Sequence, residues 1–109
     1  MPIEPEPITA IFRVFKSGMK EVIALFPEVV ADNYPPHCLS YMHVGQHGAA
    51  DYDGVIRGSR PATPEESAPL RRELESLFEY VITEKKRASY AMYKKRRDEV
   101  HSVQVMPEG

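Results

Sequence analysis

The chain has 109 residues, of which 42% are hydrophobic and 28% are charged, and its formal net charge is -2. This balance argues against a disordered chain and against a membrane protein, and the length predicts one domain. The single cysteine, Cys38, excludes a disulfide framework within the chain. The longest apolar run, Val22 to Phe26, is too short to span a bilayer, and no leader peptide precedes it. We therefore expect a cytoplasmic location and no membrane partner.

The first part of the chain predicts a β-hairpin behind a disordered lead-in. Prolines alternate with glutamates in residues 1–7, and proline cannot donate ladder hydrogen bonds. Ile8 to Lys16 and Glu21 to Phe26 are rich in β-branched and aromatic residues, with a Ser-Gly turn between them. Pro27 ends the second strand or places it at a sheet edge, and residues 28–31 could form a further extended piece.

The middle of the chain predicts a third strand and a long loop. Cys38 to Val44 carries apolar groups on both faces, as in a strand that is covered on both sides. Gly45 to Thr63 contains four glycines and little periodicity, so we expect a long loop with at most a short extended piece at Val55-Ile56.

A helix is predicted over residues 64–78. Thr63 and Glu66 have the spacing of a capping box, and Pro64 suits the first helical position. An apolar stripe follows at helical spacing and must pack on another element; it consists of Leu70, Leu74, Leu77 and Phe78. Pro69 predicts either a kink or a later helix start, near Ser67 or Ala68.

The last part predicts a strand, a basic helix and a tail. Tyr80 to Thr83 has strand-like composition, and Ser89 can cap a helix that runs toward Val100. Residues 101–109 are expected to form a loose C-terminal tail or a short added strand, which leaves residues 8–100 as one domain.

These elements predict an α+β fold in the order β-β-β-α-β-α. A small antiparallel sheet of three to four strands would carry the helix of residues 64–78 across one face, with the basic C-terminal helix beside it. The edge strands of so small a sheet, together with the apolar third strand, predict a homodimer.

Part of the chain resembles short uncharacterised bacterial proteins. The resemblance lies in Phe26-Pro27-Glu28, in the segment Ser-Tyr-Met-His-Val-Gly-Gln-His-Gly-Ala-Ala-Asp-Tyr of residues 40–52, and in Arg60-Pro61-Ala62. It implies no activity, ligand or catalytic residue.

Three of the four histidines, the cysteine and two aspartates lie within residues 37–53. If the loop folded back, His43, His47 and Asp51 could bind zinc or a similar divalent ion with an open position for water. Asp53 could take the place of Asp51 in this site, and His37 or Cys38 is an outside candidate. On an extended strand, however, the spacing of His43 and His47 does not place both side chains on one face. We therefore assign no catalytic residue and predict no cofactor.

Three further motifs in or near this segment are weaker. Cys38 with His43 or His37 has the composition of a nucleophile and its base, but a buried and inert Cys38 is the better interpretation. The Asp-x-Asp-Gly of residues 51–54 lacks the other ligands of a calcium loop. The Gly-x-x-Gly of residues 45–48 is more simply a turn than an RNA-binding loop.

The C-terminal part carries a local basic excess. Residues 1–69 have nine acids and five Lys/Arg, whereas residues 70–109 have seven acids and nine Lys/Arg. Cations and two tyrosines gather in one segment that contains no acid; they are Lys85, Lys86, Arg87, Tyr90, Tyr93, Lys94, Lys95, Arg96 and Arg97. Cations bind phosphates and tyrosines stack on unpaired bases.

The sequence therefore predicts a small non-enzymatic binding module whose partner is nucleic acid or an acidic protein. The alternative interpretation of this segment is a solvated helix face with Tyr90 and Tyr93 in the core. A small metal-dependent hydrolase using His43, His47 and Asp51 is the second hypothesis for function. The third is an oligomeric accessory protein in which Gly45 to Thr63 forms the subunit interface.

Overall fold

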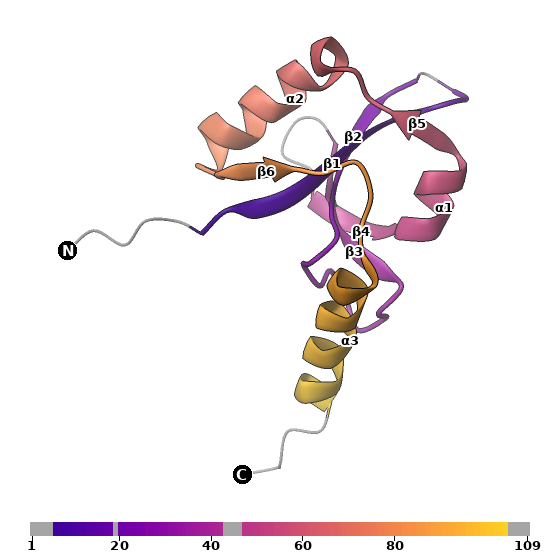
Figure 1. Ribbon diagram of the computed structural model, residues 1–109, viewed down its shortest axis with the longest axis vertical. Helices are drawn as coiled ribbons and strands as arrows, with labels where there is room; N and C mark the ends of the chain where they lie inside the picture. The colour runs from indigo at the N-terminus through magenta and orange to yellow at the C-terminus, as the bar shows by residue number, and fades with distance from the viewer. Residues whose placement is uncertain (1–5, 19, 43–46, 105–109) are drawn as a thin grey trace, which may run out of the picture.

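A computed structural model describes residues 6–18, 20–42 and 47–104, with side chains described as far as His101. One curved sheet forms the body, and helices lie on and beside it (Figure 1). The elements in chain order are β1 (Ile8–Phe15), β2 (Val22–Phe26), β3 (His37–Tyr41), β4 (His47–Asp51), α1 (Tyr52–Arg57), β5 (Ser59–Pro61), α2 (Pro64–Leu77), β6 (Ile82–Glu84) and α3 (Tyr90–Gln104). The α+β class predicted from the sequence is confirmed.

Within the described residues the sheet has six strands, in the order β4-β3-β2-β1-β5 with β6 also paired to β1. The predicted three to four strands are therefore too few. All described pairings are antiparallel except that of β1 with β6, which is parallel. β5 and β6 share β1 because each has only three residues: β5 pairs with its second half and β6 with its first.

The segment expected to be a long loop contains three of these elements. β4 pairs with β3 over its whole length, α1 follows it directly, and β5 returns to the sheet. The prediction of a short extended piece at Val55-Ile56 is wrong, because both residues belong to α1. The third strand ends at Tyr41 rather than Val44, and residues 43–46 lie outside the described residues. The further extended piece at residues 28–31 is not a strand, and β2 is central rather than at an edge.

Both faces of the sheet are buried, because β1 and β2 alternate apolar side chains between them. One face packs Phe12, Phe26 and Tyr41 against Leu70 and Leu74 of α2. On the other face Ile11, Ile23, Leu25, Cys38 and Ala50 pack together, and residues of α1 cover them. The sheet therefore separates two apolar clusters, one on each of its faces.

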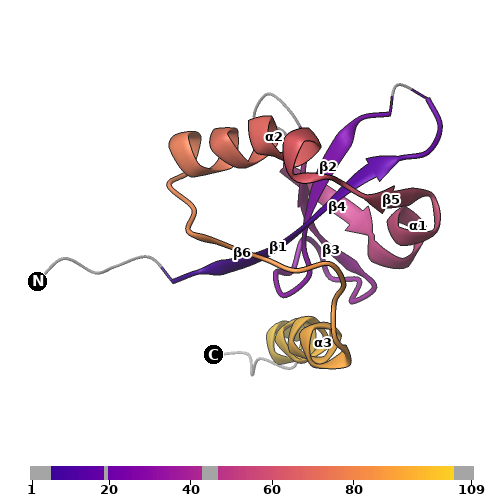
Figure 2. The ribbon, with the colours of Figure 1, turned by 45° about the horizontal axis from the view of Figure 1, so that its top comes forward.

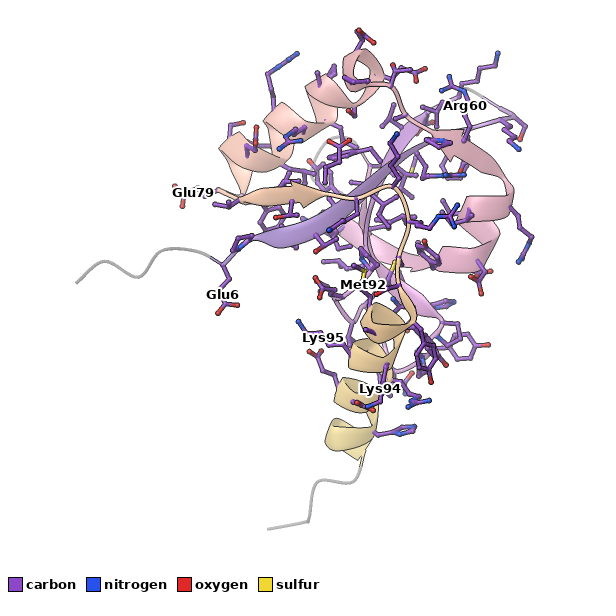
Figure 3. The ribbon with its side chains drawn as sticks, in the orientation of Figure 1. Glu6, Arg60, Glu79, Met92, Lys94 and Lys95 are labelled. Atoms are coloured by element: carbon purple, nitrogen blue, oxygen red, sulfur yellow. The ribbon has the colours of Figure 1, made fainter. Side chains whose placement is uncertain are left out.

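The predicted N-terminus of α2 is confirmed in detail. Thr63 Oγ1 accepts from the Glu66 amide, and Glu66 Oε1 accepts from the Thr63 amide at 2.9 Å. Arg60 adds a bidentate contact to the same carboxylate, at 2.8 and 2.6 Å; Figure 3 labels Arg60, which belongs to β5. The helix begins at Pro64 and continues through Pro69, so the later start near Ser67 or Ala68 is wrong.

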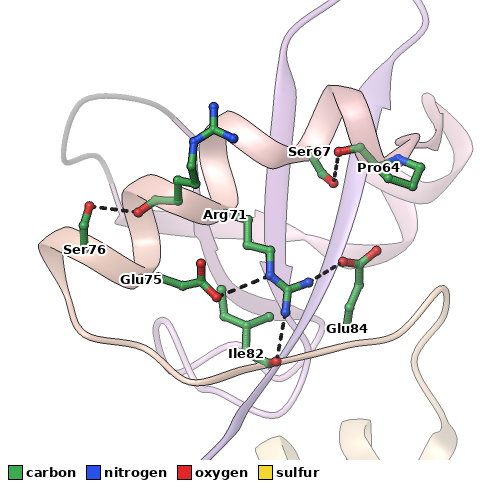
Figure 4. A network of polar contacts seen from close by, with 8 residues as sticks. Pro64, Ser67, Arg71, Glu75, Ser76, Ile82 and Glu84 are labelled. Carbon is green, nitrogen blue, oxygen red and sulfur yellow. Dashed lines mark hydrogen bonds and ion pairs between the residues drawn. The ribbon is translucent and has the colours of Figure 1, made fainter.

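The middle of α2 is joined to β6 by Arg71. Its guanidinium donates to Glu84 Oε1 at 2.8 Å and, at 3.4 Å each, to Glu75 Oε2 and the Ile82 carbonyl (Figure 4). Leu70 and Leu74 are buried as the apolar stripe predicts, but Leu77 is 62% exposed. The stripe is therefore narrower than predicted.

Buried Arg13 holds the β1 face to the α1–β5 turn. It is 8% exposed on a strand of apolar residues, and its guanidinium donates to the Ser59 carbonyl at 2.7 Å and the Ile56 carbonyl at 3.1 Å. A third bond goes to Ser59 Oγ at 2.9 Å. Desolvation by burial lowers the pKa of Arg13, and these acceptors offset the cost of taking its charge out of water.

α3 lies at the opposite end of the molecule from α2, as Figures 1 and 2 both show. The expectation that the basic helix would lie beside the helix of residues 64–78 is therefore wrong. The predicted start after Ser89 is confirmed, because the Ser89 carbonyl accepts from the amides of Met92 and Tyr93. α3 continues past Val100 to Gln104, into the segment expected to be a tail. In the described part of the chain, no helix has the length and apolar character that crossing a membrane requires.

Candidate functional site

The structure divides the basic segment between a loop and a helix. Lys85, Lys86 and Arg87 lie in the loop between β6 and α3, and all three are exposed. The Lys85 amide donates to the Ala10 carbonyl at 3.0 Å, which ties the loop backbone to β1. Among the described residues, no acid lies within ion-pair distance of these three side chains. Their charges are therefore available to an external anion.

The cations of α3 are differently placed, because most have acidic neighbours. Lys94 contacts Asp98 at 2.9 Å, and Lys95 lies 3.9 Å from Glu28 (Figure 3). Arg97 lies 3.9 Å from Asp98 and donates to the Tyr90 hydroxyl at 3.4 Å. Hydrogen bonding to Lys94 lowers the pKa of Asp98. These acids partly neutralise the helix face.

Arg96 is a structural residue, since it is only 3% exposed. Its Nε donates to the Pro35 carbonyl at 3.1 Å, and its Nη1 donates to the Pro27 carbonyl. Its guanidinium carbon lies 5.5 Å from the centre of the Tyr93 ring. Arg96 therefore fastens α3 to the two ends of the single loop that connects β2 to β3.

A pocket of about 390 Å³ opens between the start of α3 and the start of α1. Its walls come from three separate parts of the chain; they are Pro36, Tyr52, Asp53, Ala88, Ser89, Tyr90, Tyr93 and Arg96. The Tyr52 hydroxyl accepts from the Ala88 amide at 2.8 Å and so fixes the two sides relative to each other. The basic loop of residues 85–87 ends where this pocket begins.

The pocket joins aromatic faces to a carboxylate. The rings of Tyr90 and Tyr93 have their centres 6.0 Å apart, and Tyr90 is 66% exposed. Asp53 is the only acid in the lining, and no cation of the described chain lies within ion-pair distance of it. The lining therefore combines tyrosine faces with the exposed carboxylate of Asp53 and the buried guanidinium of Arg96, and the exposed cations of residues 85–87 lie next to it.

The sequence indicated Tyr90, Tyr93 and Arg96 as binding residues but gave no sign of Pro36 or Tyr52. It indicated Asp53 only as an alternative metal ligand. Pro36 and Tyr52 approach α3 because β3 and β4 pair, which brings the start of β3 beside the end of β4. Nothing in the local pattern around either residue carries that signal.

In the described part of the histidine-rich segment, the side chains do not come together. His43 lies outside the described residues. His47 Nε2 contacts the Tyr80 hydroxyl at 3.1 Å, and its ring packs 4.8 Å from the centres of Tyr41 and Phe78. Asp51 is exposed at the other end of β4, about 13 Å away along a strand that rises roughly 3.3 Å per residue. Within the described ranges, no three His, Cys, Asp or Glu side chains form a metal-binding group.

His37 and Cys38 point to opposite faces of β3. His37 Nδ1 lies 2.8 Å from Asp32 Oδ2 at the surface, and this hydrogen bond lowers the pKa of Asp32. Cys38 is fully buried, and its burial raises the thiol pKa to about 11. The thiolate is the nucleophile, so this cysteine is unsuited to covalent catalysis.

Comparison with known proteins adds no relative. No family model matches the chain, and no curated protein or solved structure is significantly similar to it. The case for a function therefore depends on the pocket and the basic loop.

Proposed function

We propose that the protein is a non-enzymatic module that binds single-stranded nucleic acid at the pocket and the adjoining basic loop. One observation carries the proposal: three exposed cations without acidic partners in the described chain stand directly beside a pocket lined by three tyrosines. Cations supply affinity for a phosphate backbone, and tyrosine rings supply surfaces on which bases stack.

The shape of the pocket favours a single strand over a duplex. A space of about 390 Å³ is at the small end of the range for ligand pockets, so it suits one nucleotide rather than a helix. A base can enter it only when it is unpaired and turned out of a stack. An acidic protein would satisfy the cations but would leave the tyrosine faces unused.

The proposal uses a smaller set of residues than the sequence predicted. Lys85, Lys86 and Arg87 hold the phosphates, and Tyr90 and Tyr93 form the stacking surface. Lys94, Lys95 and Arg97 contribute at longer range because nearby acids partly screen them. Arg96 supports the pocket from beneath.

Fluorescence anisotropy with a labelled single-stranded oligonucleotide, measured over a series of salt concentrations, tests the proposal. The triple variant Lys85→Gln, Lys86→Gln, Arg87→Gln should bind more weakly. Its plot of log affinity against log salt should be shallower by roughly 2, because three phosphate contacts at a single strand are removed.

The matched control removes the same charge elsewhere. Lys16, Lys20 and Arg72 are exposed cations outside the pocket lining, and their replacement by glutamine should leave most of the affinity in place. The proposal is wrong if the wild-type protein shows no salt-dependent binding, or if the two triple variants bind alike. Binding to polyglutamate but not to oligonucleotides would instead indicate an acidic protein partner.

A second candidate role, self-association, is favoured by the position of β4. Its described pairing is to β3 alone, and it carries neither the lysine nor the proline that commonly protects a sheet edge. Antiparallel pairing of two β4 strands about Ala49 would set His47 of one copy opposite Asp51 of the other. This role places the interface in the segment of residues 45–63.

Light scattering across a range of concentrations tests this role. The wild type should approach the mass of a dimer, whereas Ala49→Lys should stay monomeric, because two lysines would meet at the symmetry axis. A wild-type protein that remains monomeric at high concentration excludes the role.

A further inference from the structure

The charges at the pocket are arranged in a way that simple phosphate binding does not require. Asp53, an exposed carboxylate, and Arg96, a buried guanidinium, both line the pocket, while the cations of residues 85–87 stand outside the lining. Because Nε and Nη1 of Arg96 already donate to the Pro35 and Pro27 carbonyls, a phosphate in the pocket would be repelled by Asp53 and gain little from Arg96. The ligand that fits has hydrogen-bond donors at the end that enters and negative charge at the end that stays out.

We propose that the pocket selects guanine, with Asp53 accepting hydrogen bonds from the ring N1–H and the exocyclic amino group. The inference rests on the proposed function, since the strand backbone must lie along residues 85–87. It assigns to Asp53 the role of the base-reading residue and to Tyr90 and Tyr93 the role of stacking platform.

Guanine is favoured because a carboxylate presents two acceptors side by side. Only guanine carries two adjacent donors on its Watson–Crick edge, so only guanine can satisfy both oxygens. Adenine and cytosine place a ring acceptor beside their amino group, which would face one carboxylate oxygen. Uracil and thymine have no amino group at all.

The walls around Asp53 are held in place before any ligand binds. The Tyr52 hydroxyl is committed to the Ala88 amide at 2.8 Å, and Arg96 is committed to the carbonyls of Pro27 and Pro35 beneath Tyr93. A rigid site loses little freedom on binding, so differences between bases appear in the affinity.

The test uses four oligouridine strands that differ in one central nucleotide, which is guanosine, adenosine, cytidine or uridine. Anisotropy with the full-length protein should give about tenfold tighter binding of the guanosine strand than of the all-uridine strand, the discrimination that one good bidentate contact provides. Asp53→Asn should lose this preference, because its amide NH₂ meets a donor of guanine, while the salt-dependent binding remains.

Asp51→Asn is the matched control, because it removes the same charge from an exposed residue outside the pocket lining. It should keep the preference for guanosine. Equal binding of all four strands, a preference for another base, or an unchanged preference in Asp53→Asn would overturn the guanine assignment and leave the proposed function intact. No salt-dependent binding of any strand would overturn both.

Discussion

Arg96 shows how one residue can change role between a sequence and a structure. In the sequence it is one of four consecutive cations, and nothing distinguishes it from Lys94, Lys95 and Arg97. In the structure its position on the helix turns it inward, where its guanidinium donates to two backbone carbonyls and lies near the face of the Tyr93 ring. Removing all four cations together would therefore damage the fold as well as the charge, so tests of binding should leave Arg96 in place.

Replacing Arg96 by alanine is expected to lower the free energy of unfolding by about 2–4 kcal/mol. The substitution leaves the Pro27 and Pro35 carbonyls without their donor and opens a gap under Tyr93. Urea denaturation followed by circular dichroism measures the change. Lys95→Ala on the same helix should change stability by no more than about 0.5 kcal/mol, since Lys95 is exposed; equal effects would remove the anchoring role.

Glu66 should make stability depend on pH in the acid range. The hydrogen bonds from Arg60 and then from the Thr63 amide hold its pKa at about 2, below the ordinary value of 4.5. A carboxyl whose pKa is lowered by folding stabilises the folded state above its unfolded pKa, and this contribution disappears as the pH falls through its folded pKa. The stabilisation by Glu66 is therefore present above about pH 4.5 and declines as the pH falls toward 2.

Glu66→Gln should make the loss of stability at acid pH less steep. Denaturation midpoints measured at several pH values between neutrality and the acid end should fall less steeply in the variant than in the wild type. Glu65→Gln is the control, because Glu65 lies in the same helical turn and forms no ion pair within the part of the chain that the structure describes. Parallel curves for wild type and Glu66→Gln would show that the contact with Arg60 carries no such dependence.

At the scale of elements, α2 was predictable because its signals are local. The capping box, the proline at its first position and the spacing of Leu70 and Leu74 all lie within one stretch of sequence. β4 and β5 lack such signals. β4 reads His-Gly-Ala-Ala-Asp and β5 reads Ser-Arg-Pro, and neither contains a β-branched or aromatic residue. They are strands because β3 and β1 offer them ladder partners, which is a tertiary effect.

The packing of α2 supplies a prediction for a matched pair of leucines. Leu74 is fully buried against the sheet, whereas Leu77, one turn later on the same helix, is 62% exposed. Leu74→Ala should lower the free energy of unfolding by about 3 kcal/mol, because it removes buried methyl groups and leaves a cavity. Leu77→Ala should cost no more than about 0.5 kcal/mol in the same denaturation experiment.

A reversal of that order would mean that α2 packs on a different face. Such a result would also question the contact between α2 and β6, because Arg71 reaches Glu84 only when Leu70 and Leu74 face the sheet.

At the scale of the whole molecule, the class and the hairpin of β1 and β2 could be predicted, but the pocket could not. The pocket assembles Pro36, Tyr52 and Tyr93, which the sequence separates widely. It depends on the pairing of β3 with β4 and on the direction in which α3 leaves the sheet. The composition of the basic segment indicated where ligand chemistry lies. Only the fold shows which of its charges are available and that Asp53 stands among the tyrosines.

Because the thiol of Cys38 is completely buried, it can be used to measure how fast the sheet opens. Cys38 lies between strands at 0% exposure, and its thiol pKa of about 11 keeps it protonated at neutral pH. A thiol reagent in solution can therefore modify only those copies whose sheet has come apart. The rate at which Cys38 is labelled therefore reports how often the sheet opens spontaneously. The natural chain already carries this probe, so no other needs to be added.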